Sequence, residues 1–338
     1  YQETLTDPSY HRQVVVMTAP HVGNTGMNHE DEESRKIWVS GFVVRNPSPT
    51  VSNWRAKSTL EDDLIDNGVI GIKGVDTRAI TRHLRDRGSM RVGIFSNSNL
   101  SREEMVTKVR KSPQMSGAFL ANDVSTVEKY VVPAKGEKKF TVAAIDLGIK
   151  GATPRLMAER GIEVHVFPVK STLEELLAIA PDGIFLSNGP GDPASMPYAI
   201  ETVKAILEAD KSMFGICLGH QLLGLACGAK TIKMKFGHHG ANHPVLDIAS
   251  GQVAISSQNH GFAVDEASLP AHLRATHRSL FDGSLQGIEH TQRPAFSFQG
   301  HPEAAPGPHE LQGLFNKFMQ MIEQRAAARG NSHRATDR

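Results

Sequence analysis

Cysteine, aromatic residues and long apolar runs are all scarce in this chain. Its 338 residues include two cysteines and two tryptophans, and aromatic side chains make up 6% of the total. Two cysteines cannot form a disulfide framework, so we expect a reducing, cytoplasmic setting. No apolar stretch reaches the roughly 18 residues that a membrane-spanning helix needs. The sequence therefore predicts a protein without a membrane partner.

Neither sign of charge dominates. Lysine and arginine number 37 against 36 aspartate and glutamate residues. The chain thus lacks the basic excess that favours nucleic acid as a partner. It also lacks the glycine-rich motifs G-x-x-x-x-G-K-[ST] and G-x-G-x-x-G, so no nucleotide site is expected here. The hydrophobic content of 39% is enough for two ordinary domain cores of roughly 100 to 200 residues each.

One of the two cysteines has an unusual setting. Cys217 lies between Gly215 and Gly219, after the apolar run 213–216 and before the helical run 221–226. A side chain at a sharp strand-to-helix turn is held in strained backbone geometry, and glycines on either side avoid collisions. The start of a helix also favours a thiolate and can bind a developing oxyanion. Cys217 is therefore predicted to be a nucleophile for acyl chemistry.

A thiolate nucleophile needs a base and a group that orients the base. Residues 295–299 alternate in the manner of a strand and lead to His301, with Glu303 two residues later. His301 would be the base and Glu303 its orienting partner. A lone His-Pro-Glu is more often an ordinary loop, but the cysteine turn in the same chain favours the catalytic interpretation.

A glycine-rich loop follows the apolar run 183–186. It carries Gly189 and Gly191 within the segment 187–193. Open α/β sheets bind ligands at the carboxyl ends of their strands, and glycines there let backbone N–H groups approach a substrate closely. Alone this segment predicts only a turn. One strand before Cys217, it is well placed to supply an oxyanion-binding N–H group.

These three motifs together resemble the class I, or triad, glutamine amidotransferases. The resemblance implies that Cys217 attacks the side-chain amide of glutamine, with His301 as general acid and base and Glu303 as its orienting residue. It also implies oxyanion N–H groups from Leu218 and Gly191. Further contacts to glutamine are implied for Gly189, Gln221, Asn259, Gly261 and Phe262. Without the resemblance, residues 258–262 would be taken as a turn between two strands.

The sixteen histidines do not predict a metal site. His238, His239 and His243 lie close together, but no carboxylate or thiolate stands at a recognised ligand spacing from them. The segment 234–240 also recurs in the amidotransferases, which favours a loop that is structural or lines the active site. Cys227 falls in an apolar pattern, so we expect a buried packing residue.

Strand and helix patterns alternate from residue 140 onward. Strands are expected at 141–145, 163–169, 183–186 and 213–216, and helices around 154–159, 173–179 and 198–207, with a capping box from Ser171 to Glu174. This alternation predicts an α/β domain over 140–325, an open and mainly parallel sheet with helices on both faces. A polar, basic tail over 326–338 is expected to be disordered.

The first part of the chain has a different pattern. Strands are expected at 14–17, 37–44, 69–72 and 91–95, with helices at 78–87 and 102–111, the latter capped by Ser101 and Glu104. Residues 131–139 carry proline, glycine and charge without periodicity, which indicates a linker. The sequence therefore predicts a smaller α/β domain over 1–130.

Three motifs in this first domain narrow the resemblance. The segments 6–10, 20–24 and 75–78 are similar to the small, glutamine-hydrolysing subunit of carbamoyl-phosphate synthase, over residues 1 to about 325. In that family the serine corresponding to Ser9 reaches the glutamine site. The resemblance implies a large synthetase subunit as partner, with ATP and Mg on that partner. Its product, carbamoyl phosphate, would serve arginine and pyrimidine biosynthesis.

Two departures and two alternatives accompany this interpretation. The family carries further residues before the one matching Tyr1, so the sequence is expected to be truncated at its start. The stretch 149–154 lacks an asparagine expected near a helix start.

The alternatives are a free thiol amidase or peptidase of the same fold, which would not require glutamine, and a non-catalytic regulatory scaffold, which the intact Cys217, His301 and Glu303 disfavour.

Overall fold

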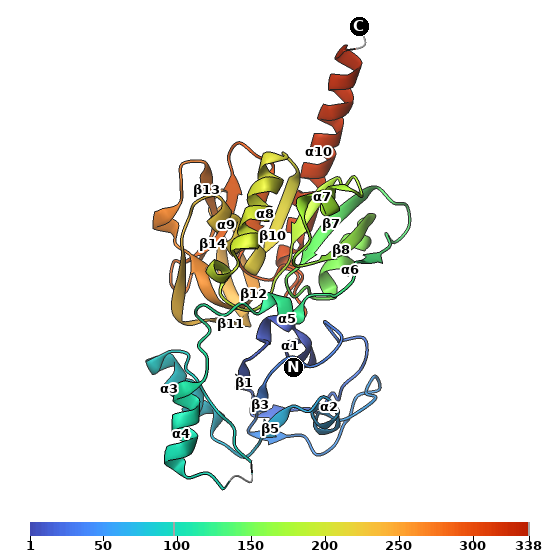
Figure 1. Ribbon diagram of the computed structural model, residues 1–338. Coiled ribbons are helices and arrows are strands. Elements are labelled where there is room, and N and C mark those ends of the chain that lie inside the picture. Colours follow the sequence, from blue (N-terminus) through green and yellow to red (C-terminus); the bar gives the residue numbers. More distant parts are fainter. Residues whose placement is uncertain (97–98, 337–338) are drawn as a thin grey trace. The chain divides into compact units, whose positions relative to one another are not determined.

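The computed structural model describes residues 1–96 and 99–336, with side chains as far as residue 328. The chain forms two units (Figure 1). The first consists of Tyr1–Ala118 and Lys235–Gly237, and the second of Phe119–Met234 and His238–Arg338. Within the described residues, no helix has the length and apolar composition that crossing a bilayer requires.

The two units divide earlier in the chain than the sequence predicts. Leu120 and Ala121 are buried, and Ala121 packs in the core of the second unit at the start of α5 (Ala121–Val124). Strand β6 (Tyr130–Val132) then pairs with β8 of the same unit. The segment 119–130, assigned to the first domain from its sequence, thus lies in the second unit.

A ten-stranded sheet forms the frame of the second unit. Its parallel centre has the order β15-β10-β9-β7-β8. These strands are β15 (Ala295–Phe298), β10 (Ser212–Ile216), β9 (Gly183–Leu186), β7 (Phe140–Asp146) and β8 (Ile162–Pro168). Strands β9 and β10 were expected from their apolar runs, because a parallel strand covered on both faces is apolar along its length. Strand β15 was expected from its alternating pattern, and β7 and β8 from the alternation of strand and helix patterns.

Antiparallel strands extend this centre on both sides. Strand β6 pairs with β8 at one edge, and β14, β13, β11 and β12 follow β15 on the other. Their bounds are β11 (Thr231–Asp247), β12 (Val253–Val264), β13 (Leu273–Ser279) and β14 (Leu285–His290). The sheet is therefore mixed, not mainly parallel as the sequence predicts, because strands joined directly without a helix pair antiparallel.

Helices cover both faces of this sheet, as predicted. Helices α7 (Leu173–Leu177), α8 (Pro197–Glu208) and α9 (Leu218–Ala226) pack on one face, and α6 (Ala152–Ala158) and α10 (Gly313–Thr336) on the other. Because successive side chains of a strand point to opposite faces of the sheet, each strand contributes to two hydrophobic cores, one on each face. In β7, Ala143 and Ile145 face the first group, and Val142 and Ala144 face the second.

Two local expectations in this unit differ from the structure. The capping box of α7 is formed by Thr172 and Glu175, one residue later than predicted. Helix α10 continues to Thr336 (Figure 1), through most of the predicted disordered tail. Residues 337–338 of that tail lie outside the described residues.

The first unit has a three-stranded parallel sheet and a second parallel pair. The sheet is β1 (Val14–Val16), β3 (Gly41–Val43) and β5 (Ile70–Ile72), and the pair is β2 (His21–Val22) and β4 (Asn46–Pro47). The helices are α1 (Gln2–Thr6), α2 (Leu60–Asp66), α3 (Thr77–Arg87) and α4 (Arg102–Lys111). The capping box of α4 is present as predicted. Residues 91–95 form no strand, and the side chain of Val92 is 54% exposed.

Short 3-10 helices complete the two units: η1 (Pro8–Tyr10), η2 (Pro193–Ser195), η3 (Glu266–Ser268) and η4 (Glu310–Gln312).

Candidate active site

Cys217 occupies a sharp turn between β10 and α9. It is the residue before Leu218, the first of the helix, and its backbone has φ 53° and ψ −103°. A non-glycine residue with positive φ is strained and needs its surroundings to hold it. A Cβ added to Gly215 would lie 2.7 Å from the carbonyl oxygen of Gly219, and one on Gly219 would overlap the carbonyl of Leu186. The two glycines are therefore required by close backbone contacts, as the motif predicts.

Sheet topology brings the histidine to the cysteine. Strand β10 pairs in parallel with β15, with Ile216 opposite Phe298, so both strands end at the same edge. The Cys217 N–H donates to the carbonyl oxygen of Phe298 at 2.9 Å. Beyond β15, the His301 N–H donates to the Ser257 carbonyl at 2.8 Å. Cys217 and His301 are 3% and 2% exposed, so their chemistry is shielded from bulk water.

His301 and Glu303 form a buried charged pair. The distance from His301 Nδ1 to Glu303 Oε1 is 2.7 Å. Burial by itself lowers the pKa of His301, but the Glu303 carboxylate and the neighbouring Cys217 outweigh it and raise the pKa to about 10. The pair thus keeps the imidazole protonated at neutral pH. Nδ1 is engaged by Glu303, while Nε2 has no hydrogen bond of ordinary geometry to any residue that the structure describes.

Lys150 completes the charged group, and the sequence did not predict it. Its Nζ is 3.1 Å from Glu303 Oε1 and donates to the Ala304 carbonyl at 2.6 Å. Burial raises the pKa of Glu303, but Lys150 and His301 outweigh burial and lower it to about 2. Lys150 belongs to the stretch noted for its missing asparagine. The sequence signal that could have identified Lys150 was a lysine in the loop directly after a buried parallel strand.

The glycine-rich loop after β9 lies against the cysteine turn. The Gly219 N–H donates to the Ser187 carbonyl at 3.0 Å, and an added Cβ on Gly189 would be 3.1 Å from the Leu218 side chain. That Cβ would also overlap the Leu147 carbonyl, so the position admits only glycine. Gly191 has a φ of 101°, which also favours glycine. The oxyanion roles of Leu218 and Gly191 stay a prediction.

The segment 258–262 lies inside β12 and is no turn, which rules out that alternative. The Cys217 Sγ lies 3.7 Å from the Asn259 carbonyl oxygen. Gln221 Nε2 donates to the carbonyl of Phe262 at 2.9 Å and to Gln299 Oε1 at 3.1 Å. The structure thus brings Asn259, Phe262 and Gln221 to the cysteine, as the resemblance implies. Their contacts with glutamine stay predictions.

Ser9 belongs to the first unit, within η1. It is 4% exposed, and its N–H donates to Asp7 Oδ1 at 2.8 Å. Its contribution to a glutamine site stays a prediction.

Two of the histidines in residues 238–243 contact other side chains. They lie on β11, so this segment is a strand where a loop was expected. His238 Nε2 is 2.9 Å from Asp282 Oδ2, and His239 Nδ1 is 3.0 Å from Asn259 Oδ1. His239 therefore helps to hold the strand segment whose carbonyl meets Cys217.

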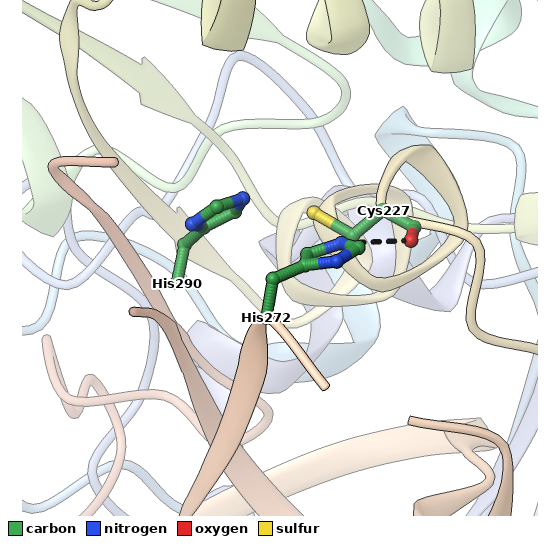
Figure 2. A group of neighbouring side chains, drawn as sticks. All are labelled: Cys227, His272 and His290. Atoms are coloured by element: carbon green, nitrogen blue, oxygen red, sulfur yellow. Dashed lines mark hydrogen bonds between the residues drawn. The ribbon is translucent and has the colours of Figure 1, made fainter. Parts of the chain in front are cut away.

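A separate group of possible metal ligands lies at the end of α9. Figure 2 shows Cys227, His272 and His290, whose ligand atoms lie within 4.8 Å of one another. His272 Nε2 donates to the Cys227 carbonyl at 3.1 Å. His290 Nδ1 accepts from the N–H groups of Gln292 and Arg293, so its other nitrogen carries the proton. Burial raises the pKa of the Cys227 thiol to about 11. In this arrangement the group does not present three free lone pairs.

Comparison with known proteins identifies related chains. A family described as Glutamine amidotransferase class-I matches residues 143–321. A second, described as Carbamoyl-phosphate synthase small chain, CPSase domain, matches residues 1–94. The second match lies within the first unit, and the first match covers most of the second unit.

Curated relatives cover nearly the whole chain. A carbamoyl phosphate synthase small chain of Streptomyces coelicolor is 56% identical over 97% of this chain and 88% of its own length. Its counterpart from Pseudomonas aeruginosa is 49% identical over 96% of this chain and 90% of its own. A solved structure from Thermoplasma acidophilum, described as belonging to a GMP synthase, has a TM-score of 0.51 at 21% identity and covers 58% of this chain and 100% of that one. That structure supports the fold alone.

Proposed function

Because the chain belongs to the family of carbamoyl phosphate synthase small chains, we propose that it hydrolyses the side-chain amide of L-glutamine and delivers ammonia to a separate synthetase subunit. One observation carries the chemical part of this proposal. Cys217, His301 and Glu303 come from two loops at one edge of the sheet, and the buried carboxylate holds the imidazole protonated beside the thiol. A protonated imidazole next to sulfur stabilises the thiolate, which is the attacking form.

The reaction follows from the charges of the group. The Cys217 thiolate adds to the amide carbon, and the N–H groups of Leu218 and Gly191 would stabilise the oxyanion. His301 then gives its proton to the amide nitrogen, the carbon–nitrogen bond breaks, and ammonia leaves a glutamyl thioester on Cys217. The neutral imidazole next takes a proton from water as it attacks the thioester, which releases glutamate and restores the thiolate.

The synthetase chemistry is assigned to the partner. The relatives are named small chains of carbamoyl phosphate synthase, and a small chain implies a large synthetase chain as its partner. The sequence has neither of the two glycine-rich nucleotide motifs, so we place ATP and Mg on that large subunit. The product would be carbamoyl phosphate, the precursor in arginine and pyrimidine biosynthesis. A free amidase or peptidase is the alternative, and it would act without glutamine or a partner.

Covalent trapping tests the proposal. A glutamine analogue with an electrophilic carbon in place of the side-chain amide should label Cys217, as located by mass spectrometry of the digested chain. Excess L-glutamine should protect Cys217, and Cys227 should stay unlabelled as an internal control. Labelling that glutamine does not slow would contradict a glutamine site and favour the free-amidase alternative.

A further inference from the structure

The half-buried group of Cys227, His272 and His290 is built from three separate elements (Figure 2). Cys227 is the C-cap residue of α9. His272 directly precedes β13, and His290 is the last residue of β14. Strand pairing places Leu273 opposite His290, so the two histidines are neighbours, and their ring centres are 4.9 Å apart. The fold thus gathers a thiol and two imidazoles that are far apart in the sequence.

The contacts of His272 are those of a metal ligand. Its Nε2 donates to the Cys227 carbonyl at 3.1 Å, which leaves the lone pair on Nδ1. Histidines that bind metal almost always donate their second ring N–H to a carbonyl, a carboxylate or water, because that bond fixes the tautomer and the ring orientation. His272 therefore already has the supporting contact that a metal site requires.

The other two side chains rearrange when a metal ion binds. The Cys227 thiol loses its proton, because the thiolate is the form that binds metal. The His290 Nδ1 leaves the N–H groups of Gln292 and Arg293, each at 3.1 Å, and the ring turns a lone pair towards the sulfur. Gln292 and Arg293 are both exposed, so water can replace the imidazole at their N–H groups. The rearrangement therefore breaks no contact that water cannot replace.

We propose that Cys227, His272 and His290 form a zinc site with water as the fourth ligand. Their ligand atoms lie within 4.8 Å of one another, and zinc bonds of about 2.0–2.3 Å require separations of roughly 3.3–3.8 Å. Side-chain torsions cover this difference of about 1 Å. Thiolate and imidazole suit zinc, whereas calcium and magnesium prefer oxygen ligands. The bound ion joins the end of α9 to the β13–β14 pair and so stabilises the folded unit.

Cobalt(II) tests the site, because cobalt bound to a thiolate gives a sulfur-to-metal charge-transfer band in the near ultraviolet. The chain has two cysteines, so in a Cys217→Ser background such a band comes from Cys227 alone. We expect the band in the full chain without a histidine tag, and its loss when Cys227→Ser is added. His272→Asn and His290→Asn should each raise the Kd for cobalt at least about tenfold. His29→Asn is the matched control, since the side chain of His29 is 85% exposed and lies outside the group; it should leave Kd unchanged.

Thermal unfolding gives a second readout. Zinc about a hundredfold above its Kd should raise the Tm of the Cys217→Ser chain by several degrees, and adding Cys227→Ser should abolish the rise. A Cys217→Ser chain without a cobalt band would overturn the inference. So would unchanged cobalt affinity in the two histidine variants, which would show adventitious binding by a thiol alone. Neither readout involves glutamine, so the result is independent of the proposed function.

Discussion

The catalytic residues act as one charged unit, so their substitutions should not have additive effects. Cys217→Ser removes the thiolate, and we expect glutamine hydrolysis to fall by about three orders of magnitude or more without loss of folding. His301→Asn should lose nearly as much, and Glu303→Gln less, because orientation contributes less than proton transfer. Ammonia release by the purified complexes measures this order. Cys227→Ser is the control and should keep full activity; equal residual activity in the three site variants would contradict the assigned roles.

The Glu303 and His301 pair should stabilise the folded protein only within a defined pH range. The pKa of Glu303 is lowered from 4.5 to about 2, so its contribution is present above pH 4.5 and is lost as pH falls toward 2. The pKa of His301 is raised from 6.5 to about 10, so its contribution is present below pH 6.5 and is lost as pH rises toward 10.

The Tm difference between wild type and Glu303→Gln should therefore be largest between about pH 4.5 and 6.5 and shrink on both sides. Thermal unfolding followed by circular dichroism at a series of pH values measures it. A Tm difference independent of pH would mean that packing, and not charge, explains the effect.

Single residues differed in how far the sequence could predict them. The Cys217 turn and the His301–Glu303 pair were visible because each motif is local in the chain. Lys150 was not, because its salt bridge joins residues that are brought together only by the parallel order of β7, β9, β10 and β15. A pattern within one segment carries no information on that long-range contact.

At the scale of elements, the junction of β10 and α9 depends on close backbone packing. Gly219→Ala would drive a Cβ into the Leu186 carbonyl, so we expect destabilisation of about 1–3 kcal/mol and a displaced helix start. Glutamine hydrolysis should fall with it, because Cys217 and the Leu218 N–H would move. Urea unfolding and ammonia release check the two effects.

Gly313→Ala at the start of α10 is the matched change, since an added Cβ there meets nothing within 4 Å. It should be neutral or slightly stabilising. If Gly219→Ala behaved the same way, the required contact at the turn would be disproved.

Helices and strands could be predicted from the sequence where the burial and the periodicity of their apolar residues agreed. The parallel strands 183–186 and 213–216 follow from buried apolar runs. The long antiparallel strands β11 and β12 were not expected, because their polar active-site residues interrupt the alternation and resemble turn sequences. Residues 91–95 have the composition of a strand but form none, so local propensity failed there.

At the scale of the whole molecule, an uncoupled glutaminase would waste glutamine. We expect the isolated chain to hydrolyse glutamine slowly and to accelerate severalfold or more when a matching synthetase subunit, ATP and bicarbonate are added, because the partner would favour the aligned state of the site. Carbamoyl phosphate should then appear. Ammonia and carbamoyl phosphate assays on the isolated chain and the complex measure the coupling.

The complex with Cys217→Ser should still make carbamoyl phosphate from free ammonia, because that step needs nothing from the triad. Failure to use ammonia despite normal assembly would contradict the ammonia-donor assignment. So would an isolated chain that is fully active and indifferent to a synthetase.

The Lys150 contact has a consequence for the electrostatics of turnover. In the thiolate–imidazolium form from which the proposed mechanism starts, the charges of the thiolate, the imidazolium, the Glu303 carboxylate and the Lys150 ammonium sum to zero. When the thiolate becomes a thioester, the imidazolium has already passed its proton to the departing nitrogen, and Lys150 and Glu303 again balance. Each stable state of the cycle is thus neutral inside a site where an unpaired ion would be costly. Ammonia leaves as a neutral molecule, so no counter-ion has to leave the site with it.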